Sequence, residues 1–185
     1  MQNKEQLRKK NLKKRKKNYF EVKLNFFNPL IRLIKKKFDT KTINISLYYP
    51  ANFEVNTLKF FDYCNLKGIK TLLPIILNKN KMKFFKWKYK EDVLFVNKFG
   101  ILEPKENNKN FVPQIILIPL LAFDNNKFRL GYGKGYYDIF LKKLLLKHKN
   151  IIIIGIGFSF QKCNKLPISK HDIKMKYILT EKGLI

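Results

Sequence analysis

Cysteine is scarce in this sequence, which contains only Cys64 and Cys163, far apart and without CxxC spacing. This scarcity argues against a disulfide framework or a zinc site, and it favours a reducing compartment. The basic N-terminus is not followed by the apolar core of a signal peptide. No apolar run approaches the roughly 20 residues that a membrane span requires. We therefore expect a cytoplasmic protein that does not contact a membrane.

Acidic residues are also few, because 13 Asp and Glu stand against 40 Lys and Arg, a formal net charge of +27. Such a charge is typical of nucleic-acid-binding proteins, since Lys and Arg release counterions from phosphates. Lys, Asn, Ile and Phe are enriched along the whole sequence, however, which also fits a biased base composition. Net charge by itself describes solubility and association rather than a specific function. We expect no specific nucleic-acid partner, although an anionic substrate would benefit from the positive field.

Apolar residues, by contrast, are plentiful enough for a folded core. Hydrophobic residues make up 45% of the 185 residues and aromatic residues 15%, which excludes a disordered polycation and fits one domain. Periodicity predicts helices over 4–38, interrupted at Pro29, and over 57–66 and 136–149, and strands over 43–49, 71–77, 81–88, 115–118, 151–154 and 177–179. Strands that alternate with helices predict an α/β fold with a largely parallel sheet.

The most informative segment runs from Arg129 to Asp138 and reads RLGYGKGYYD. It lies between an expected buried strand and an expected helix, which is where open α/β sheets bind ligands. Glycines at alternate positions permit positive φ, so that backbone N–H groups can converge on a phosphate. Arg129 and Lys134 would neutralise phosphate charge, and Asp138 could hold Mg²⁺. The alternative is a flexible glycine turn in which Asp138 complements the helix dipole.

The residues from Pro119 to Asp138 resemble the 5-formyltetrahydrofolate cyclo-ligase family, also called 5,10-methenyltetrahydrofolate synthetases. That family combines Pro-x-x-(Ala/Gly)-Phe-Asp with Arg-Leu-Gly-x-Gly-x-Gly-Tyr-Tyr-Asp, and the second part is complete here. The resemblance implies a single domain over 1–185 with a basic helical region over 1–40. It also implies a layered α/β sandwich like that of the NagB/RpiA/CoA transferase proteins, with a largely parallel sheet flanked by helices.

The resemblance also implies roles for individual residues. The residues implied to bind ATP are Lys4, Arg8, Arg129, Leu130, Gly131, Tyr132, Gly133, Lys134, Gly135, Tyr136 and Tyr137, with Arg129 and Lys134 as the catalytic pair. Those implied to bind the folate are Tyr49, Glu54, Met82 and Trp87, and those implied to hold Mg²⁺ are Asp138 and Asp172. Further landmarks are the segment 99–104, Gln161, Leu166-Pro167, His171 and Thr180-Glu181. Residues 9–40 and Gln114 depart from the family pattern.

The implied reaction is the Mg²⁺- and ATP-dependent cyclisation of 5-formyltetrahydrofolate, with or without a polyglutamate tail, to 5,10-methenyltetrahydrofolate. The formyl oxygen would be phosphorylated by ATP before N10 attacks, and ADP and phosphate would be released. We expect a monomer.

Two other functions stay open at this level. Lysines interleaved with Phe84, Phe85, Trp87 and Tyr89 could provide stacking platforms for a nucleic acid. An ATP-dependent enzyme acting on another amide-like substrate would use the same glycine segment. The smaller landmarks also have plain structural explanations: Lys4 and Arg8 lie in a helix so rich in lysine that their spacing is nearly unavoidable, and Trp87 is as well explained by packing.

Overall fold

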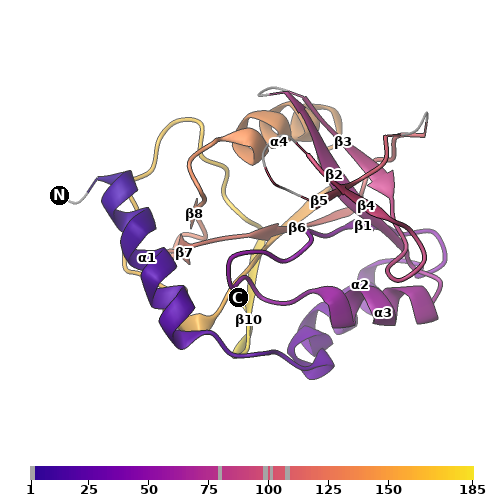
Figure 1. The fold of residues 1–185 in the computed structure, drawn as a ribbon, viewed down its shortest axis with the longest axis horizontal. Helices are drawn as coiled ribbons and strands as arrows, with labels where there is room; N and C mark the ends of the chain where they lie inside the picture. Colours follow the sequence, from indigo (N-terminus) through magenta and orange to yellow (C-terminus); the bar gives the residue numbers. More distant parts are fainter. Residues whose placement is uncertain (1–2, 79–80, 98–99, 101, 107–108) are drawn as a thin grey trace.

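The centre of the molecule is a seven-stranded sheet with the order β11-β10-β9-β6-β1-β2-β3 (Figure 1). The computed structural model describes residues 3–78, 81–97, 100, 102–106 and 109–185. The strands of this sheet are β1 (Asn44–Ser46), β2 (Lys70–Asn78), β3 (Lys81–Lys86), β6 (Ile115–Pro119), β9 (Ile152–Ile156), β10 (Tyr177–Thr180) and β11 (Gly183–Leu184). The five strands from β10 to β2 are mutually parallel, and antiparallel β11 and β3 close the two edges. The predicted largely parallel sheet is confirmed.

Strand β6 lies in the middle because its sequence is apolar on both faces. Ile115 to Ile118 are fully buried, and β6 pairs in parallel with β1 on one side and β9 on the other. A strand covered on both faces needs a continuous apolar run rather than an alternating one. Each such side chain contributes about 2 kcal/mol by leaving water.

Helices cover both faces of the sheet. On one face lie a 3-10 helix (η1, Leu24–Phe27), α2 (Asn28–Lys37) and α3 (Leu58–Leu66), which pack Phe27, Leu30 and Phe60 into the larger core. On the opposite face α4 (Tyr136–Lys147) packs Leu141 into a second core. Helix α1 (Lys4–Asn18) lies to one side of these layers, near β7 (Ala122–Phe123) and β8 (Arg129–Leu130) (Figure 1).

The N-terminal helical region is interrupted earlier than the sequence predicts. Helix α1 ends at Asn18, and Tyr19–Lys23 is extended before η1 and α2 begin. Pro29 does not break a helix, because it occupies the first turn of α2, where its missing N–H is not needed. The extended segment instead lets Val22 reach the core, where it is 3% exposed.

Strand β9 also differs from the predicted 151–154, because it continues through Gly155 to Ile156. A Cβ at Gly155 would lie 2.7 Å from Ile178 and 2.9 Å from Leu120, so close packing explains the glycine. Helix α3 ends as expected before Gly68, whose φ is +67°. Helix α4 and the other predicted strands are present, with β1 shorter than the predicted 43–49.

Two small antiparallel pairs were not predicted. Strand β4 (Leu94–Val96) pairs with β5 (Leu102–Pro104), and β7 pairs with β8. Phe99 and Ile101 of the 99–104 landmark lie outside the described residues. Across the described part of the chain, none of the helices combines the length and apolar character of a membrane span.

Candidate active site

A cavity of about 710 Å³ opens beyond the carboxyl ends of β1 and β6. Tyr48 and Tyr49, which follow β1, and Pro119, which ends β6, form part of its wall. From β1 the chain builds the sheet toward β2, whereas from β6 it builds the sheet in the opposite direction toward β9. Such a topological switch point leaves a crevice between the diverging connections, and open α/β sheets bind ligands there.

Most of the residues singled out in the sequence line this one cavity. They are Lys4, Arg8, Tyr49, Glu54, Arg129, Leu130, Gly131, Tyr132, Gly133, Lys134, Gly135, Tyr136, Tyr137, Asp138 and Asp172, together with His171 and Glu103. These residues come from helix α1, the loop after β1, strand β5, the glycine-rich segment and the segment before β10. The fold therefore brings together five distant parts of the chain.

The glycine-rich segment makes the tight turn from β8 into α4. Gly133 and Gly135 have φ values of +97° and +71°, and Gly135 is the residue before the first turn of α4. Gly131 lies outside the positive-φ range, so the expectation of positive φ applies to two of the three glycines. The amino end of α4, with its partial positive charge, borders the cavity and suits an anion.

Gly133 is needed for a second reason, which is the close approach of Arg8. A Cβ at position 133 would lie 2.9 Å from Arg8 Cζ, so the guanidinium lies against the bare backbone. Arg8 Nε also donates a hydrogen bond of 3.0 Å to the Gly131 carbonyl. Helix α1 thus places a cation directly on the glycine-rich segment.

Arg129 and Asp138 form an ion pair at the two ends of this segment. Arg129 Nη2 lies 3.0 Å from Asp138 Oδ1, and the Arg129 side chain is only 4% exposed. Among the residues that the structure describes, Arg129 Nη1 is buried without a hydrogen-bond partner. A buried donor of this kind is costly unless it is satisfied, so it fits a site that accepts an anionic ligand.

Asp172 lies on the same side of the cavity and pairs with Lys4 at 2.6 Å. Burial alone would raise the pKa of Asp172, but hydrogen bonds from Lys4 and the Ser169 backbone outweigh burial and lower it. The next residue, Ile173, donates its N–H to Asp138 Oδ1. The two carboxylates implied to hold a metal are therefore brought together.

These carboxylates suit Mg²⁺ shared with a phosphate. The contacts of Asp138 use Oδ1 and those of Asp172 use Oδ2, so each carboxylate has a second oxygen outside these contacts. Within the described residues no group of three or more His, Cys, Asp or Glu could hold a metal. Mg²⁺ accepts one or two carboxylates when phosphate oxygens and water complete its shell.

Glu54, in the loop after β1, also lines the cavity. It is 7% exposed, and its two oxygens accept hydrogen bonds from the Tyr132 hydroxyl at 2.6 Å and the Ala51 N–H at 3.0 Å. Burial raises the pKa of Glu54, although both hydrogen bonds and the charge of Arg15 lower it in part. Burial and the neighbouring carboxylate of Glu54 also raise the pKa of Tyr132, so this phenol stays protonated and donates.

Arg15 is a functional candidate that the sequence reading missed. It is 1% exposed, and it donates hydrogen bonds to the Leu120 carbonyl, the Asn52 carbonyl and the Tyr132 hydroxyl. One available signal was helical phase, since Arg15 lies eleven residues, or about three turns, after Lys4 and so shares its face. Nine of the fifteen residues of α1 are Lys or Arg, however, and this hid the signal.

Met82 and Trp87, two of the four residues implied to bind folate, are not among the residues that line the cavity. Met82 is 4% exposed in the core beneath α4, and Trp87 is 2% exposed and packs edge-on against Phe61. Phe84 and Phe85 are also buried. The proposed stacking platforms for a nucleic acid therefore lose three of their four rings to the interior, because the chain is covered on both faces here: consecutive Phe84 and Phe85 are both buried.

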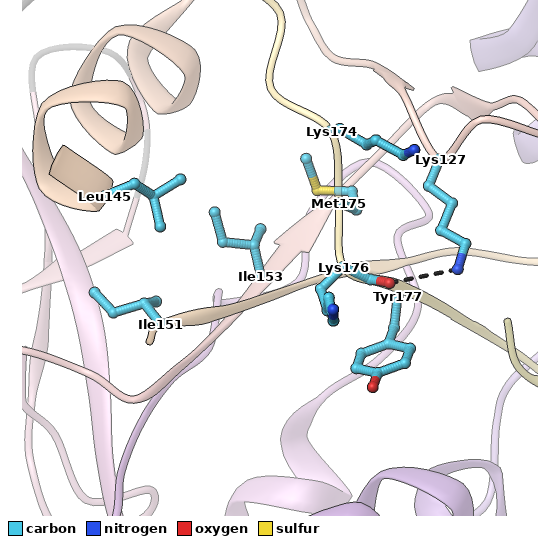
Figure 2. Close-up of a pocket in the computed structure, with 8 residues that line it drawn as sticks. All are labelled: Lys127, Leu145, Ile151, Ile153, Lys174, Met175, Lys176 and Tyr177. Carbon is cyan, nitrogen blue, oxygen red and sulfur yellow. Dashed lines mark hydrogen bonds between the residues drawn. The ribbon is translucent and has the colours of Figure 1, made fainter. Parts of the chain in front are cut away.

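A second cavity, of about 570 Å³, lies beside β9 and the segment before β10 (Figure 2). Lys127, Lys174 and Lys176 surround an apolar floor that includes Ile151 and Ile153. Lys127 Nζ already donates to the Lys176 carbonyl. The described residues that line this cavity include neither a carboxylate nor a cysteine, so the cavity at the switch point is the better candidate for catalysis.

Comparison with known proteins agrees with this geometry. The model of the 5-formyltetrahydrofolate cyclo-ligase family matches residues 1–181. The chain belongs to this family. The match includes residues 9–40, where the sequence departs from the family pattern.

Individual members of the family are similar over most of their length. The cyclo-ligase of Haemophilus influenzae is 31% identical over 141 residues, which are 74% of each chain. That of Mycoplasma pneumoniae is 29% identical over 185 residues, covering 95% of this chain and 96% of the relative. The solved structure of the Aquifex aeolicus 5,10-methenyltetrahydrofolate synthetase superposes with a TM-score of 0.74 at 32% identity, covering 98% and 91% of the two chains. The family and the enzyme class predicted from the sequence are confirmed.

Proposed function

We propose that this cyclo-ligase family member converts 5-formyltetrahydrofolate to 5,10-methenyltetrahydrofolate with ATP as the phosphoryl donor. One observation carries the proposal: a single cavity is lined both by the cationic, glycine-rich segment, which we assign as the nucleotide end, and by the buried carboxylate of Glu54, which we assign as the folate end. The first suits a triphosphate and the second suits the hydrogen-bond donors of a pterin ring. The names of the relatives support the same reaction.

At the first end we assign the phosphates of ATP to Arg8, Arg129, Lys134 and the backbone of 130–137, with Lys4 nearby. Arg129 and Lys134 would carry the catalytic role, because they can stabilise charge on the transferred phosphoryl group. Mg²⁺ held by Asp138 and Asp172 would neutralise phosphate charge.

At the second end we assign the folate to Tyr49 and Glu54. The ionised carboxylate of Glu54 would accept hydrogen bonds from the ring and fix the orientation of the formyl group. Neither Met82 nor Trp87 lines the cavity. Trp87 would support Tyr49, against which it packs edge-on, and Met82 would support Ile76, its partner in the β2–β3 pair.

The reaction needs positioning more than acid–base chemistry. The formyl oxygen takes the γ-phosphoryl group, and ADP leaves. N10 then attacks the formyl carbon, phosphate departs with the original oxygen, and N10 loses its proton as the methenyl bridge forms. Arg129 and Lys134 balance the negative charge that passes from ATP to the departing phosphate.

The decisive assay mixes the purified protein with 5-formyltetrahydrofolate and Mg·ATP and follows the near-UV absorbance of the methenyl product. Controls omit ATP or chelate the metal. We expect product only with both present, together with equimolar ADP and phosphate. ADP release without methenyl product, or product from another N-formyl or amide substrate alone, would overturn the substrate assignment.

We further propose that residues 1–185 form one domain of the NagB/RpiA/CoA transferase type, with a basic helical region over 1–40. We propose that it works as a cytoplasmic monomer. Light scattering coupled to size-exclusion chromatography tests the monomer directly, with a dimer mass as the contrary result.

A further inference from the structure

Three cationic side chains on one face of helix α1 make three different contacts. Lys4, Arg8 and Arg15 lie within about 40° of one another around the helix, because successive residues are about 100° apart. Lys4 pairs with Asp172 and Arg8 lies on Gly133, so both reach the proposed nucleotide end. Arg15 instead reaches the proposed folate end, and it is the one fully buried residue of the helix.

The guanidinium of Arg15 contacts two loops that are far apart in the sequence. Its Nη2 lies 2.7 Å from the Asn52 carbonyl, in the loop that carries Glu54. The same nitrogen donates to the hydroxyl of Tyr132, which lies between two glycines of the glycine-rich segment. Tyr132 in turn donates to Glu54, so a directed chain of hydrogen bonds runs from Arg15 through Tyr132 to the Glu54 carboxylate.

The loop held by Arg15 is conformationally strained. Asn52 and Phe53 are consecutive non-glycine residues with positive φ, at 48° and 61°. Such a pair persists only where the surroundings hold it in place. Arg15, which donates to the Asn52 carbonyl, and Glu54, whose carboxylate accepts from the Ala51 N–H, help to hold this turn, together with the Glu54 N–H, which donates to the Ala51 carbonyl.

We propose that Arg15 is a positioning residue that fixes Tyr132 and the strained 51–54 loop so that Glu54 presents an ionised, oriented carboxylate to the folate. Arg15 lies on the same helix as Lys4 and Arg8. The position of helix α1 against the glycine-rich segment therefore also determines the position of the Glu54 carboxylate. The inference rests on the role of Glu54 in the proposed function.

The charge around Glu54 makes Arg15 important for its ionisation as well as its orientation. The titratable groups that interact electrostatically with Glu54 are Arg15 from α1, Tyr132 from the glycine-rich segment, Tyr48 from the loop after β1 and Tyr137 from α4. Of these four, Arg15 alone is a cation. Its removal would leave the buried Glu54 carboxylate without a cation among these groups.

The test compares Arg15→Met, Arg15→Lys, Tyr132→Phe and the double variant Arg15→Met/Tyr132→Phe with wild type. Arg15→Met keeps the length and the apolar stem of the side chain. The control is Lys17→Met, at an exposed position near the end of the same helix. Each protein is measured for kcat and KM toward folate and ATP, for the pH profile of kcat/KM and for Tm.

We expect Arg15→Met to lower kcat/KM for the folate about 10- to 100-fold, the range for losing hydrogen bonds from a charged group. The double variant should be hardly worse than Arg15→Met, because both changes break the same chain. Burial already raises the pKa of Glu54 and Arg15 lowers it, so the acid limb of kcat/KM should move to higher pH in Arg15→Met. Relative to Arg15→Met, Arg15→Lys should bring the acid limb of kcat/KM closer to the wild-type pH than it brings the rate to the wild-type value. Lysine keeps the positive charge but lacks the planar guanidinium that donates to two acceptors.

A purely structural role would give a lower Tm with an unshifted pH profile and additive effects of the two changes, and this would overturn the proposal. If Arg15→Met does not fold, Tyr132→Phe and Arg15→Lys carry the same test, because both keep a cation at position 15. An inactive wild type would contradict the proposed function. In that case the binding of 5-formyltetrahydrofolate alone, measured by calorimetry for the same variants, still decides the role of Arg15.

Discussion

Gly133 shows how one residue makes room for a distant side chain. Its φ of +97° and its contact with Arg8 both require the absence of a Cβ, whereas Gly135 has a comparable φ of +71° and meets only Ile139 at 3.8 Å. Gly135 is therefore a matched control for backbone strain. The difference between the two positions is the guanidinium of Arg8.

Alanine at either position should lower the free energy of unfolding, measured without nucleotide, by about 1 kcal/mol, because an alanine is strained at positive φ. Gly133→Ala should also displace Arg8 and raise the KM for ATP about tenfold. Denaturant unfolding and steady-state kinetics measure the two effects. The interpretation is wrong if the effects of Gly133→Ala and Arg8→Ala on the KM for ATP multiply in the double variant. Both changes would remove the same contact of Arg8, so the double variant should resemble Arg8→Ala.

Arg129 and Lys134 differ in burial, and this separates their expected effects. The Arg129 side chain is 4% exposed and paired with Asp138, whereas Lys134 is exposed. Arg129→Ala should lower kcat about 100-fold and also cost about 2 kcal/mol of stability, less than a fully buried pair because Asp138 is 21% exposed.

Lys134→Ala should lower kcat by a similar factor and leave the unfolding midpoint unchanged. Turnover and urea midpoints of the two variants measure this contrast. Near-normal rates in both variants would remove the glycine-rich segment from the proposed mechanism.

Helix α1 is attached to the rest of the molecule largely through polar contacts. Arg15 is its one fully buried residue, Leu7 is half-buried and Leu12 is 38% exposed. Asn3 and Gln6 form a capping box that satisfies the first turn. Few apolar contacts give low local stability, so the helix depends on its ion pairs and hydrogen bonds to stay seated.

Hydrogen exchange should therefore be faster in α1 than in β6, and Mg·ATP should slow it selectively in α1. The reason is that a nucleotide bound by Lys4 and Arg8 stabilises the seated helix through its binding free energy. Peptide-resolved deuterium uptake measures both elements, with β6 as the internal reference. Equal hydrogen-exchange protection of α1 with and without Mg·ATP would show that this helix does not bind the nucleotide.

Across the whole molecule, a net charge of +27 surrounds a cavity lined by Lys4, Arg8, Arg129 and Lys134. Such a field concentrates anionic substrates, and salt screens it over about 10 Å at 0.1 M. The same charge gives nonspecific affinity for polyanions. With Phe84, Phe85 and Trp87 buried, these three rings are not available to stack on the bases of a nucleic acid.

Raising the salt from about 0.05 M to about 0.5 M should increase the KM for ATP several-fold while kcat stays nearly constant, because screening weakens attraction more than it affects contacts inside the site. Matching the osmolality with sucrose should leave KM unchanged. A fall in kcat at constant KM would show that salt acts on the fold or the chemistry instead of on substrate attraction.

The sequence by itself determined the features that depend on neighbouring residues. The apolar run 115–118 specifies a strand covered on both faces, and the alternate glycines before Tyr136 specify a tight turn into a helix. These signals are local, since backbone geometry and side-chain polarity act over a few residues. Family resemblance then extended them to a nucleotide and folate site, most of whose residues do line one cavity.

Only the tertiary structure decided which distant side chains meet. Arg15 and Tyr132 are 117 residues apart, and Lys4 and Asp172 are 168 apart, so their pairing depends on how the sheet brings α1 to the ends of β1 and β6. The burial of Met82 and Trp87 and the extended segment before η1 depend on the same layers. Such contacts exist because the chain folds back on itself, and no local pattern of residues encodes the partner.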